Sequence, residues 1–296
     1  MKPSRRTYHE GSVAVQIRVG VREAAEHVGR SVGPDIRPVA AAFLALQPML
    51  VIGAADKAGR VWSSLLTGAP GFARATGATT VLVVGGVPAH DPLGTAFAEG
   101  DRAPVGTIAL DPRTRRRMRL NGTATLGPRG LSIDADEVFS NCPKYLQKRE
   151  LRGRDDTAHS GTPHHGDRLT PAQRSRVREA DTFFLATLGP DGTADASHRG
   201  GNPGFVQVVS PTELAWPDYR GNAMFLTLGN LESDARAGLL FIDWDTGTTL
   251  QLSGTARTHY GDEARTVRFS IEHVVETEGA SPLRWSPPEF SPANPG

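Results

Sequence analysis

A short polar segment at positions 197–202 is the first place where residue types and their spacing could do chemistry. It contains a hydroxyl, a guanidinium, two glycines and an amide, supplied by Ser197, Arg199, Gly200, Gly201 and Asn202. The planar guanidinium of an arginine matches two phosphate oxygens at once, which a lysine ammonium does not. The segment is therefore a candidate binding site for an anion such as a phosphate group.

A second candidate is a run of arginines at alternate positions. Arg115, Arg117 and Arg119 share one face of an expected strand, because successive side chains of a strand point to opposite faces. Two interpretations stay open. The row is either a charged sheet edge, which discourages aggregation, or it directs one arginine, preferentially Arg117, at an anionic ligand.

Cysteine and histidine give weaker signals. Cys142 lies at an expected helix start, and we expect it to pack rather than to react. The histidines of segment 159–165 lack the spacing of a rigid metal-binding pair, so no metal is predicted. His198 alternates with Arg199 along an extended segment and is expected to point away from the ligand. Because the sequence contains no nucleophile elbow, P-loop or HExxH motif, a cofactor is expected to carry the chemistry, and no catalytic side chain is assigned.

The composition excludes several classes of protein. With 33 Lys plus Arg against 32 Asp plus Glu, the net charge of +1 does not favour a nucleic-acid partner. A single cysteine cannot close an intrachain disulfide, which favours a cytoplasmic location. Gln47 and Pro48 interrupt the longest apolar stretch, whereas a membrane span needs roughly 20 apolar residues. We expect no membrane span and no signal peptide.

An internal repeat organises the chain. Pro-Gly-Phe at 70–72 recurs 133 residues later at 203–205, and Leu-x-Gly-Thr-Ala at 120–124 recurs 132 residues later at 252–256. The stretches that end with the second motif, 105–124 and 237–256, align without a gap, and each predicts a strand, an Asp-containing turn and a second strand. Upstream of these, each repeat predicts a hairpin, at 48–64 and at 183–197. The repeating unit is therefore a mostly antiparallel β domain.

Helices and a linker complete the predicted organisation. Segments 21–30, 38–46 and 171–180 have helical composition, the last with Thr170 as its N-cap. Segment 152–168 lacks apolar periodicity and predicts an exposed linker. The expected domains are 1–151 with its leading helices, the linker 152–168, and 169–296. Such a repeat suggests a fused homodimer whose halves pack about a pseudo-twofold axis, with a cofactor pocket favoured at their interface.

Both repeats resemble the pyridoxamine 5'-phosphate oxidase-like FMN-binding split-barrel family. In the second repeat the resemblance rests on DASHRGGNPGFVQVV (195–209), PDYRGN (217–222) and NLESDARAGLLFIDWDTGTTLQLSGT (230–255). In the first repeat it rests on RVWSSLLTGAPGF (60–72), Asp91-Pro92-Leu93 and NCPKYLQKR (141–149). The resemblance implies a mainly β fold with flanking helices (α+β), built from two tandem FMN-binding split β-barrels packed as an intramolecular pseudo-dimer.

The resemblance also implies a site. FMN would lie at the interface of the two barrels, with its phosphate bound by the polar segment that begins at Ser197. Further ligands by position are Asn222, Thr227 and Asn230, and Arg117 would reach the phosphate from the first repeat. The first repeat would also supply an opposing wall around Trp62, Ser63 and Leu93. It has Leu66 at the position of Arg199, so one FMN site rather than two is expected.

Two functional hypotheses follow from the resemblance. The first is an FMN-dependent oxidoreductase that acts on a small-molecule substrate, with a separate reductase or electron donor as a further partner. The alternative is a non-catalytic split-barrel protein that binds flavin, haem or no cofactor. Pyridoxamine phosphate itself is not favoured as the substrate, because the C-terminal arginine and histidine pattern of the authentic oxidase is not found. Since the chain would contain its own pseudo-dimer interface, a monomer or a weak homodimer is expected.

Overall fold

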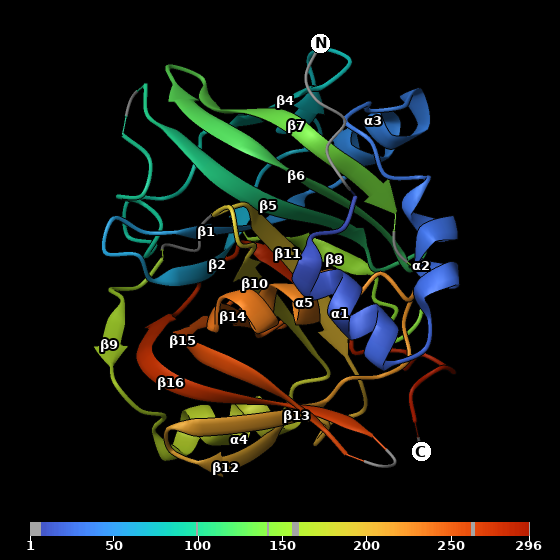
Figure 1. Ribbon diagram of the computed structural model, residues 1–296. Helices are drawn as coiled ribbons and strands as arrows, with labels where there is room; N and C mark the ends of the chain where they lie inside the picture. Colours follow the sequence, from blue (N-terminus) through green and yellow to red (C-terminus); the bar gives the residue numbers. More distant parts are fainter. Residues whose placement is uncertain (1–6, 99, 141, 156–159, 262–263, 296) are drawn as a thin grey trace.

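Strands dominate the structure, a computed structural model that describes residues 7–98, 100–140, 142–155, 160–261 and 264–295 (Figure 1). These residues contain five α-helices, α1 (Glu10–Arg18), α2 (Arg22–Gly29), α3 (Pro38–Ala45), α4 (Pro171–Glu179) and α5 (Leu226–Ser233). The predicted mainly β class is confirmed. The three predicted helices are confirmed as α2, α3 and α4, whereas α1 and α5 were not predicted. No helix in the described part of the chain is long and apolar enough to cross a membrane.

The first half of the chain forms one antiparallel sheet. Its strands are β1 (Met49–Ala55), β2 (Val61–Thr67), β3 (Ala73–Ala75), β4 (Thr80–Val84), β5 (Arg102–Asp111), β6 (Arg116–Gly127) and β7 (Gly130–Ser140). They follow the order β2-β1-β5-β6-β7-β4-β3. The predicted hairpin at 48–64 is confirmed as β1 and β2, and the predicted strand pair at 105–124 is confirmed as β5 and β6.

The second half forms a sheet with the same order of strands. Its strands are β10 (Thr182–Leu188), β11 (Ala194–Gly200), β12 (Gln207–Ser210), β13 (Glu213–Pro217), β14 (Arg236–Ile242), β15 (Thr249–Tyr260) and β16 (Arg265–Thr277). They follow the order β11-β10-β14-β15-β16-β13-β12, which matches the first sheet strand for strand. In both cases the described strands form an open hydrogen-bonded path rather than a closed barrel.

Three short strands lie in the predicted linker and the C-terminal segment. β8 (Leu151–Arg154) pairs with β17 (Leu283–Trp285), and β9 (His164–Gly166) pairs with β16. The side chains of β8 and β9 are exposed. His159 of the predicted linker lies outside the described residues. The chain between the two halves is thus exposed but partly hydrogen-bonded to the second half.

The repeated sequence motifs occupy equivalent turns and bulges. Gly71 and Gly204 of the Pro-Gly-Phe motifs have positive φ angles of 91° and 89°, a conformation that glycine adopts without strain. Their amides donate to carbonyl oxygens at the ends of α3 and α4, Ala45 and Arg178, at 2.7 Å in each case. This capping contact explains why the motif recurs with its glycine.

The Leu-x-Gly-Thr-Ala motifs mark a bulge in each sheet. The register shifts between Asn121 and Gly122 in β6 and between Ser253 and Gly254 in β15. A Cβ atom on Gly122 would lie 2.1 Å from the carbonyl oxygen of Asp134, and one on Gly254 would lie 2.0 Å from that of Ser270. Because each bulge brings the facing backbone this close, both positions require glycine.

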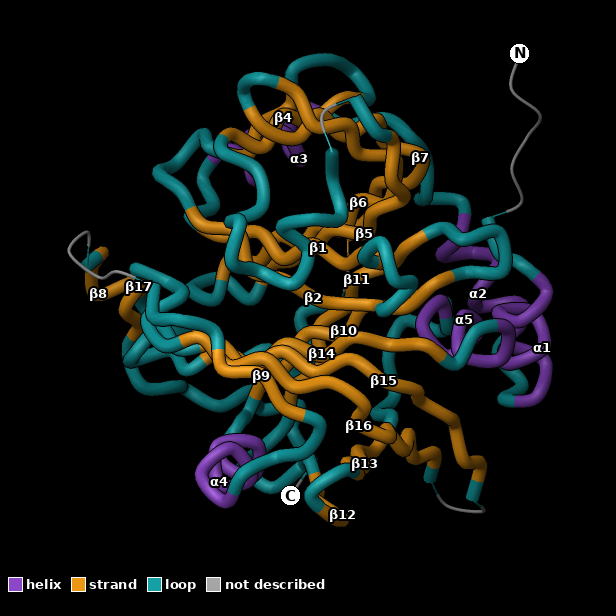
Figure 2. The backbone as a smooth tube through the Cα atoms, turned by 90° about the vertical axis from the view of Figure 1, so that its left-hand side faces the viewer, coloured by secondary structure: helices purple, strands orange, loops and turns teal. Residues whose placement is uncertain are grey.

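The two sheets pack directly on each other, as Figure 2 shows in a side view. Glycines at the interface allow backbones to approach closely. A Cβ on Gly106 of β5 would lie 2.4 Å from the Cα of Asp195 in β11. At the equivalent place, a Cβ on Gly238 of β14 would lie 2.6 Å from the Cα of Trp62 in β2. A shared apolar cluster that includes Val51, Ile108, Phe184, Ala196 and Leu240 fills the interface.

The N-terminal helix α1 packs on α5, a helix of the second half (Figures 1 and 2). The contact is close at two glycines, since a Cβ on Gly11 would lie 2.3 Å from the carbonyl oxygen of Gly229. Val15 of α1 belongs to the apolar core of the second sheet. The N-terminal segment therefore covers the half of the molecule that is distant in sequence.

Candidate functional site

A cavity of about 130 Å³ lies where the start of β6 meets the end of β11. β6 contributes Arg117 and Arg119, and β11 contributes Ser197, His198 and Arg199. Segment 217–228, which runs from the end of β13 into the first turn of α5, closes one side. We call this cavity the arginine pocket. It lies between the two halves because β11 packs against β5 and β6 of the first sheet.

Arg117 is fixed at the pocket by contacts on both sides. Its Nη1 donates to His198 Nδ1 at 2.8 Å, and its Nη2 donates to the carbonyl oxygens of Cys142 and Lys144. Burial lowers the pKa of Arg117 to about 10, which still leaves the guanidinium charged at neutral pH. Since an arginine can donate and not accept, Nδ1 of His198 is the acceptor and Nε2 bears the hydrogen.

His198 is a neutral histidine in this arrangement. Its pKa lies well below the ordinary value because the ring is buried, and because Arg117 and Arg199 repel a second positive charge. The prediction that His198 points away from the pocket was wrong, since it lines the pocket and orients Arg117.

Arg119 lies deepest of the three arginines. It forms a buried ion pair with Asp195, and Asn121 donates to the same carboxylate at 3.1 Å. The ring of Phe139 lies 4.8 Å from its guanidinium carbon. Burial, aided by repulsion from Arg199, lowers the pKa of Arg119 to about 9. The first half thus places a second charged arginine at the pocket.

Arg199 completes the group from the second half. Its Nη1 donates to Asp218 Oδ1 at 3.1 Å, and Arg265 donates to the other oxygen of that carboxylate at 3.0 Å. Asp218 is therefore shared by two arginines and neutralises Arg199 in part.

The Nε atoms of Arg117, Arg119 and Arg199 are buried and have no hydrogen-bond partner among the described residues. Buried N–H groups normally have a partner. Together with Lys144, the three arginines outnumber the carboxylates of Asp195 and Asp218, which pair with Arg119 and Arg199. The pocket thus offers unmet donors and an excess of positive charge, which suits an anionic ligand.

Strained backbone also gathers at the pocket. Four non-glycine residues of the described chain have positive φ angles, and three of them, Tyr145, Ala223 and Phe225, line this cavity. Such conformations cost of the order of 1–3 kcal/mol each and cluster at functional sites. Next to them, Thr227 Oγ1 donates to Ser197 Oγ at 3.2 Å, which places two hydroxyls together at the pocket.

The structure brings part of the predicted site together. The predicted residues that line the arginine pocket are Arg117, Ser197, Arg199, Gly200, Asn222 and Thr227. Sequence reasoning did not assign Arg119 to the site, although its alternation with Arg117 was a usable signal. It also missed Tyr145 and Asp218, which lie within the motifs that carry the family resemblance.

The remaining predicted residues lie elsewhere. Asn202 contacts the C-terminal segment, donating to the carbonyl oxygen of Pro295 at 3.0 Å. Gly201 is buried against Phe205, and Asn230 contacts His9 and Thr187. Trp62 donates to Asp56, while Ser63 is fully buried beside Gln251. These five residues do not line the arginine pocket, and their assignment to a cofactor site stays a prediction.

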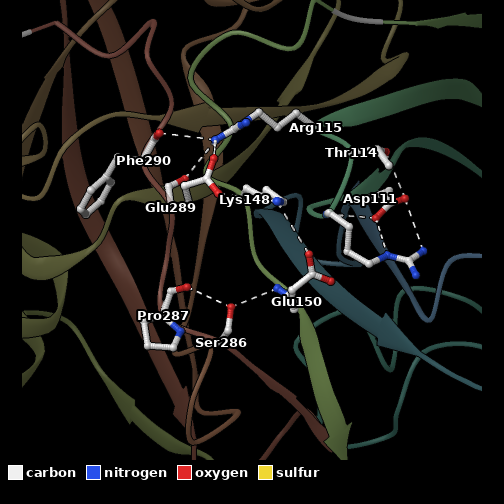
Figure 3. Close-up of polar contacts among 10 residues, drawn as sticks. Asp111, Thr114, Arg115, Lys148, Glu150, Ser286, Pro287, Glu289 and Phe290 are labelled. Carbon is white, nitrogen blue, oxygen red and sulfur yellow. Dashed lines mark hydrogen bonds and ion pairs between the residues drawn. The ribbon is translucent and has the colours of Figure 1, made fainter.

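Arg115 departs from the row of alternating arginines. It donates to Glu289 Oε1 at 3.1 Å and to the carbonyl oxygen of Phe290, and it faces the C-terminal segment (Figure 3). Lys148 approaches the same glutamate at 3.5 Å. Neither of the two interpretations applies to the whole row. Arg115 contacts the C-terminal segment, whereas Arg117 and Arg119 line the arginine pocket.

The equivalent place in the first half is filled by neutral side chains and one buried carboxyl group. Gln251 stands where the second site has Arg119, and its amide donates to Ser64 Oγ at 3.0 Å and to Asp91 Oδ2 at 3.1 Å. Ser64 donates to Asp91 Oδ1 at 2.6 Å. Burial raises the pKa of Asp91. The two halves thus differ at the position where a ligand would bind.

These observations describe two β sheets with the same strand order and, between them, a cavity at which three arginines converge. Residues 169–289 match the Pyridoxamine 5'-phosphate oxidase family. The resemblance stated from the sequence is therefore confirmed for this segment, which lies in the second repeat. A comparison with curated protein sequences gave no match.

Several solved structures are similar to part of the chain. A pyridoxamine 5'-phosphate oxidase candidate from Lactobacillus delbrueckii is 20% identical, over 37% of this chain and 94% of that one, with a TM-score of 0.31. The HupZ protein of Group A Streptococcus is 11% identical, over 36% and 98%, with a TM-score of 0.31. An FAD-binding protein from Mesorhizobium loti is 14% identical, over 39% and 97%, with a TM-score of 0.29.

Proposed function

We propose that the arginine pocket binds the phosphate of a flavin, and that the protein is an FMN-dependent oxidoreductase acting on a small molecule. The observation that carries the proposal is the convergence of Arg117, Arg119 and Arg199, each with an unpartnered buried Nε. The family match of residues 169–289 selects flavin among the anions that such a pocket could bind.

The residues present fit a phosphate group. Charge-assisted hydrogen bonds from guanidinium groups are about twice as strong as neutral ones. The hydroxyls of Ser197 and Thr227 lie together on the second half, and His198 holds Arg117 in place. When bound, the flavin supplies hydride or electron transfer, and the chain supplies binding and orientation.

The same proposal covers the architecture. The two halves, 1–151 and 169–296, are proposed to be tandem split barrels packed as an intramolecular pseudo-dimer, with 152–168 as linker. Two facts support it, the identical strand orders and the matching contacts of Gly106 with Asp195 and of Gly238 with Trp62. A cytoplasmic location and a separate electron donor complete the proposal.

Flavin titration tests the proposed site. The purified protein is titrated with FMN and with riboflavin, which lacks the phosphate, and flavin fluorescence is followed at fixed salt. We expect FMN to bind and riboflavin to bind far more weakly. Equal affinities for FMN and riboflavin would mean that the pocket does not recognise the phosphate. If FMN does not bind at all, the proposal is wrong.

A second measurement separates the enzyme from a non-catalytic binding protein. The flavin complex is reduced without oxygen, and its visible spectrum is followed while small electron acceptors are added. Reoxidation by a small molecule supports an oxidoreductase. A bound flavin that exchanges electrons with no acceptor supports the non-catalytic alternative, and a haem spectrum in the purified protein would replace flavin altogether.

A further inference from the structure

A second cavity, of about 480 Å³, lies behind the Arg119–Asp195 ion pair. The N-terminus of α1, the middle of β6 and β7, and the β10–β11 turn surround it. Five carboxyl groups line it, from Glu10, Asp136, Glu137, Asp191 and Asp195, and none of the described residues that line it is a lysine or an arginine. We call it the acidic pocket. Its charge is opposite to that of the arginine pocket on the other side of Arg119.

Two buried oxygens at the acidic pocket have no hydrogen-bond donor among the described residues. Asp195 and Asn121 are 4% and 7% exposed, and their Oδ2 and Oδ1 atoms are unpartnered. The other oxygen of Asp195 already accepts from Arg119 and Asn121, and the amide nitrogen of Asn121 already donates to Glu137 at 3.0 Å. Leaving a buried acceptor unpaired is energetically costly.

His9 adds a third atom without a hydrogen-bond partner. Its Nε2 lies 2.8 Å from Asn230 Oδ1, and Asn230 uses its amide nitrogen to donate to Thr187. Because an amide oxygen can accept and not donate, Nε2 of His9 bears a hydrogen in this contact. The Nδ1 atom of the same ring is buried and unpartnered. The acidic pocket therefore combines negative charge with two buried acceptor oxygens and one ring nitrogen that lack partners.

We propose that the acidic pocket binds a small organic cation that bears a primary ammonium or guanidinium group. Such a group supplies several N–H donors and a positive charge at once. A metal ion fits less well, because no group of three or more His, Cys, Asp or Glu side chains in the described chain is placed to hold one. The site is separate from the proposed flavin pocket, so either can fail without the other.

Calorimetric titration with butylammonium and with butylguanidinium tests the proposal, with 1-butanol as the neutral control. One cation is expected to bind per chain and 1-butanol is expected not to bind. Tetramethylammonium, which has charge but no N–H group, is expected to bind at least tenfold more weakly, because charge-assisted hydrogen bonds carry much of the affinity. Equal binding of tetramethylammonium would overturn the hydrogen-bonding part of the proposal, and no heat from either N–H cation would overturn the whole.

Two charge-neutralising variants locate the site. Glu137→Gln keeps an acceptor for the amide of Asn121. Asp191→Asn keeps a residue type that favours this turn, in which the next residue, Gly192, has a φ of 73°. Each is expected to weaken cation binding by about tenfold through loss of one charge. Asp245→Asn, an exposed carboxylate in another hairpin, is the control and is expected to change nothing. If both pocket variants fold and bind as the wild type does, the cation lies elsewhere and the proposal is wrong.

Discussion

Arg199 combines strong donors with partial exposure, which makes it the clearest residue-scale test of the arginine pocket. Its side chain is 23% exposed and has one carboxylate partner, Asp218, shared with Arg265. Hydrogen bonds to charged groups contribute about 1.5–3 kcal/mol, so we expect Arg199→Ala to weaken FMN binding by about tenfold to several hundredfold. Fluorescence titration at fixed salt measures it.

The matched control for Arg199 is Arg268, an arginine of the same half that pairs with Glu213 at 2.8 Å and is 54% exposed. Arg268→Ala is expected to leave FMN affinity unchanged. Unchanged affinity in Arg199→Ala, with a folded protein by circular dichroism, would contradict the assignment and shift the phosphate to Arg117 and Arg119.

His198 gives a pH prediction. Its folded-state pKa is depressed, whereas an unfolded histidine titrates near about 6.5. Below that pH the unfolded state binds a proton that the folded state refuses, so His198 lowers the free energy of unfolding as the pH falls. His198→Gln keeps an acceptor for Arg117 but does not titrate.

Urea unfolding at pH 7.5 and pH 5 measures this effect. We expect the wild type to lose more stability between the two pH values than His198→Gln does. An equal loss in both proteins would mean that His198 is not held neutral by burial and its arginine neighbours.

At the residue scale, the sequence predicted those residues of the arginine pocket whose placement depends on local strand geometry. Ser197 and Arg199 lie on β11 as expected, and the alternation of Arg117 with Arg119 is a property of β6 alone. Asn202 could not be placed, because β11 ends at Gly200 and the C-terminal segment, 92 positions away at Asn294, occupies the amide. The pairing of Arg119 with Asp195 depends on packing between the halves, which no local pattern reveals.

At the scale of elements, the equivalent bulges of β6 and β15 make a paired prediction. Gly122→Ala and Gly254→Ala each place a Cβ against a facing carbonyl oxygen, at 2.1 and 2.0 Å. Overpacking of this kind costs about 1–3 kcal/mol, and we expect both variants to lose similar stability. Gly153→Ala is the control, since its Cβ would meet nothing within 4 Å.

Thermal or urea unfolding of the three glycine variants decides the matter. A large loss of stability in one bulge variant and none in the other would mean that the two motifs do not have the same structural role. It would contradict the interpretation of the two motifs as equivalent parts of a repeat.

The predicted elements were those with strong local signals. α4 begins with Thr170 and Gln173 as a capping box and Pro171 in its first turn, so its start is encoded locally. By contrast, α5 has no side-chain cap and follows Phe225 in a left-handed conformation. Its five buried residues are explained by packing under α1, a contact between segments more than 200 residues apart. Such a helix is stabilised by tertiary packing and carries little local signal.

At the scale of the whole molecule, the two halves face each other with unequal sites. Duplication would create two equivalent pockets, and the substitution of Arg119 by Gln251 and of Arg199 by Leu66 distinguishes them. The Ser64–Asp91–Gln251 network satisfies its own hydrogen bonds and contains no guanidinium group to bind an anion. The chain therefore has the positive charge needed to bind a phosphate at one of the two positions, the arginine pocket.

This asymmetry predicts the binding stoichiometry. Equilibrium dialysis with FMN is expected to saturate at one flavin per chain, and light scattering is expected to give a monomer that retains the flavin, because Arg117, Arg119 and Arg199 all belong to one chain. Arg119→Gln copies the first-half residue into the pocket and should abolish that binding, because it removes a buried charge and leaves Asp195 without its ion-pair partner. Two flavins per chain would show that the first-half site also functions. Binding that appears only when chains dimerise would place the pocket between molecules rather than within one.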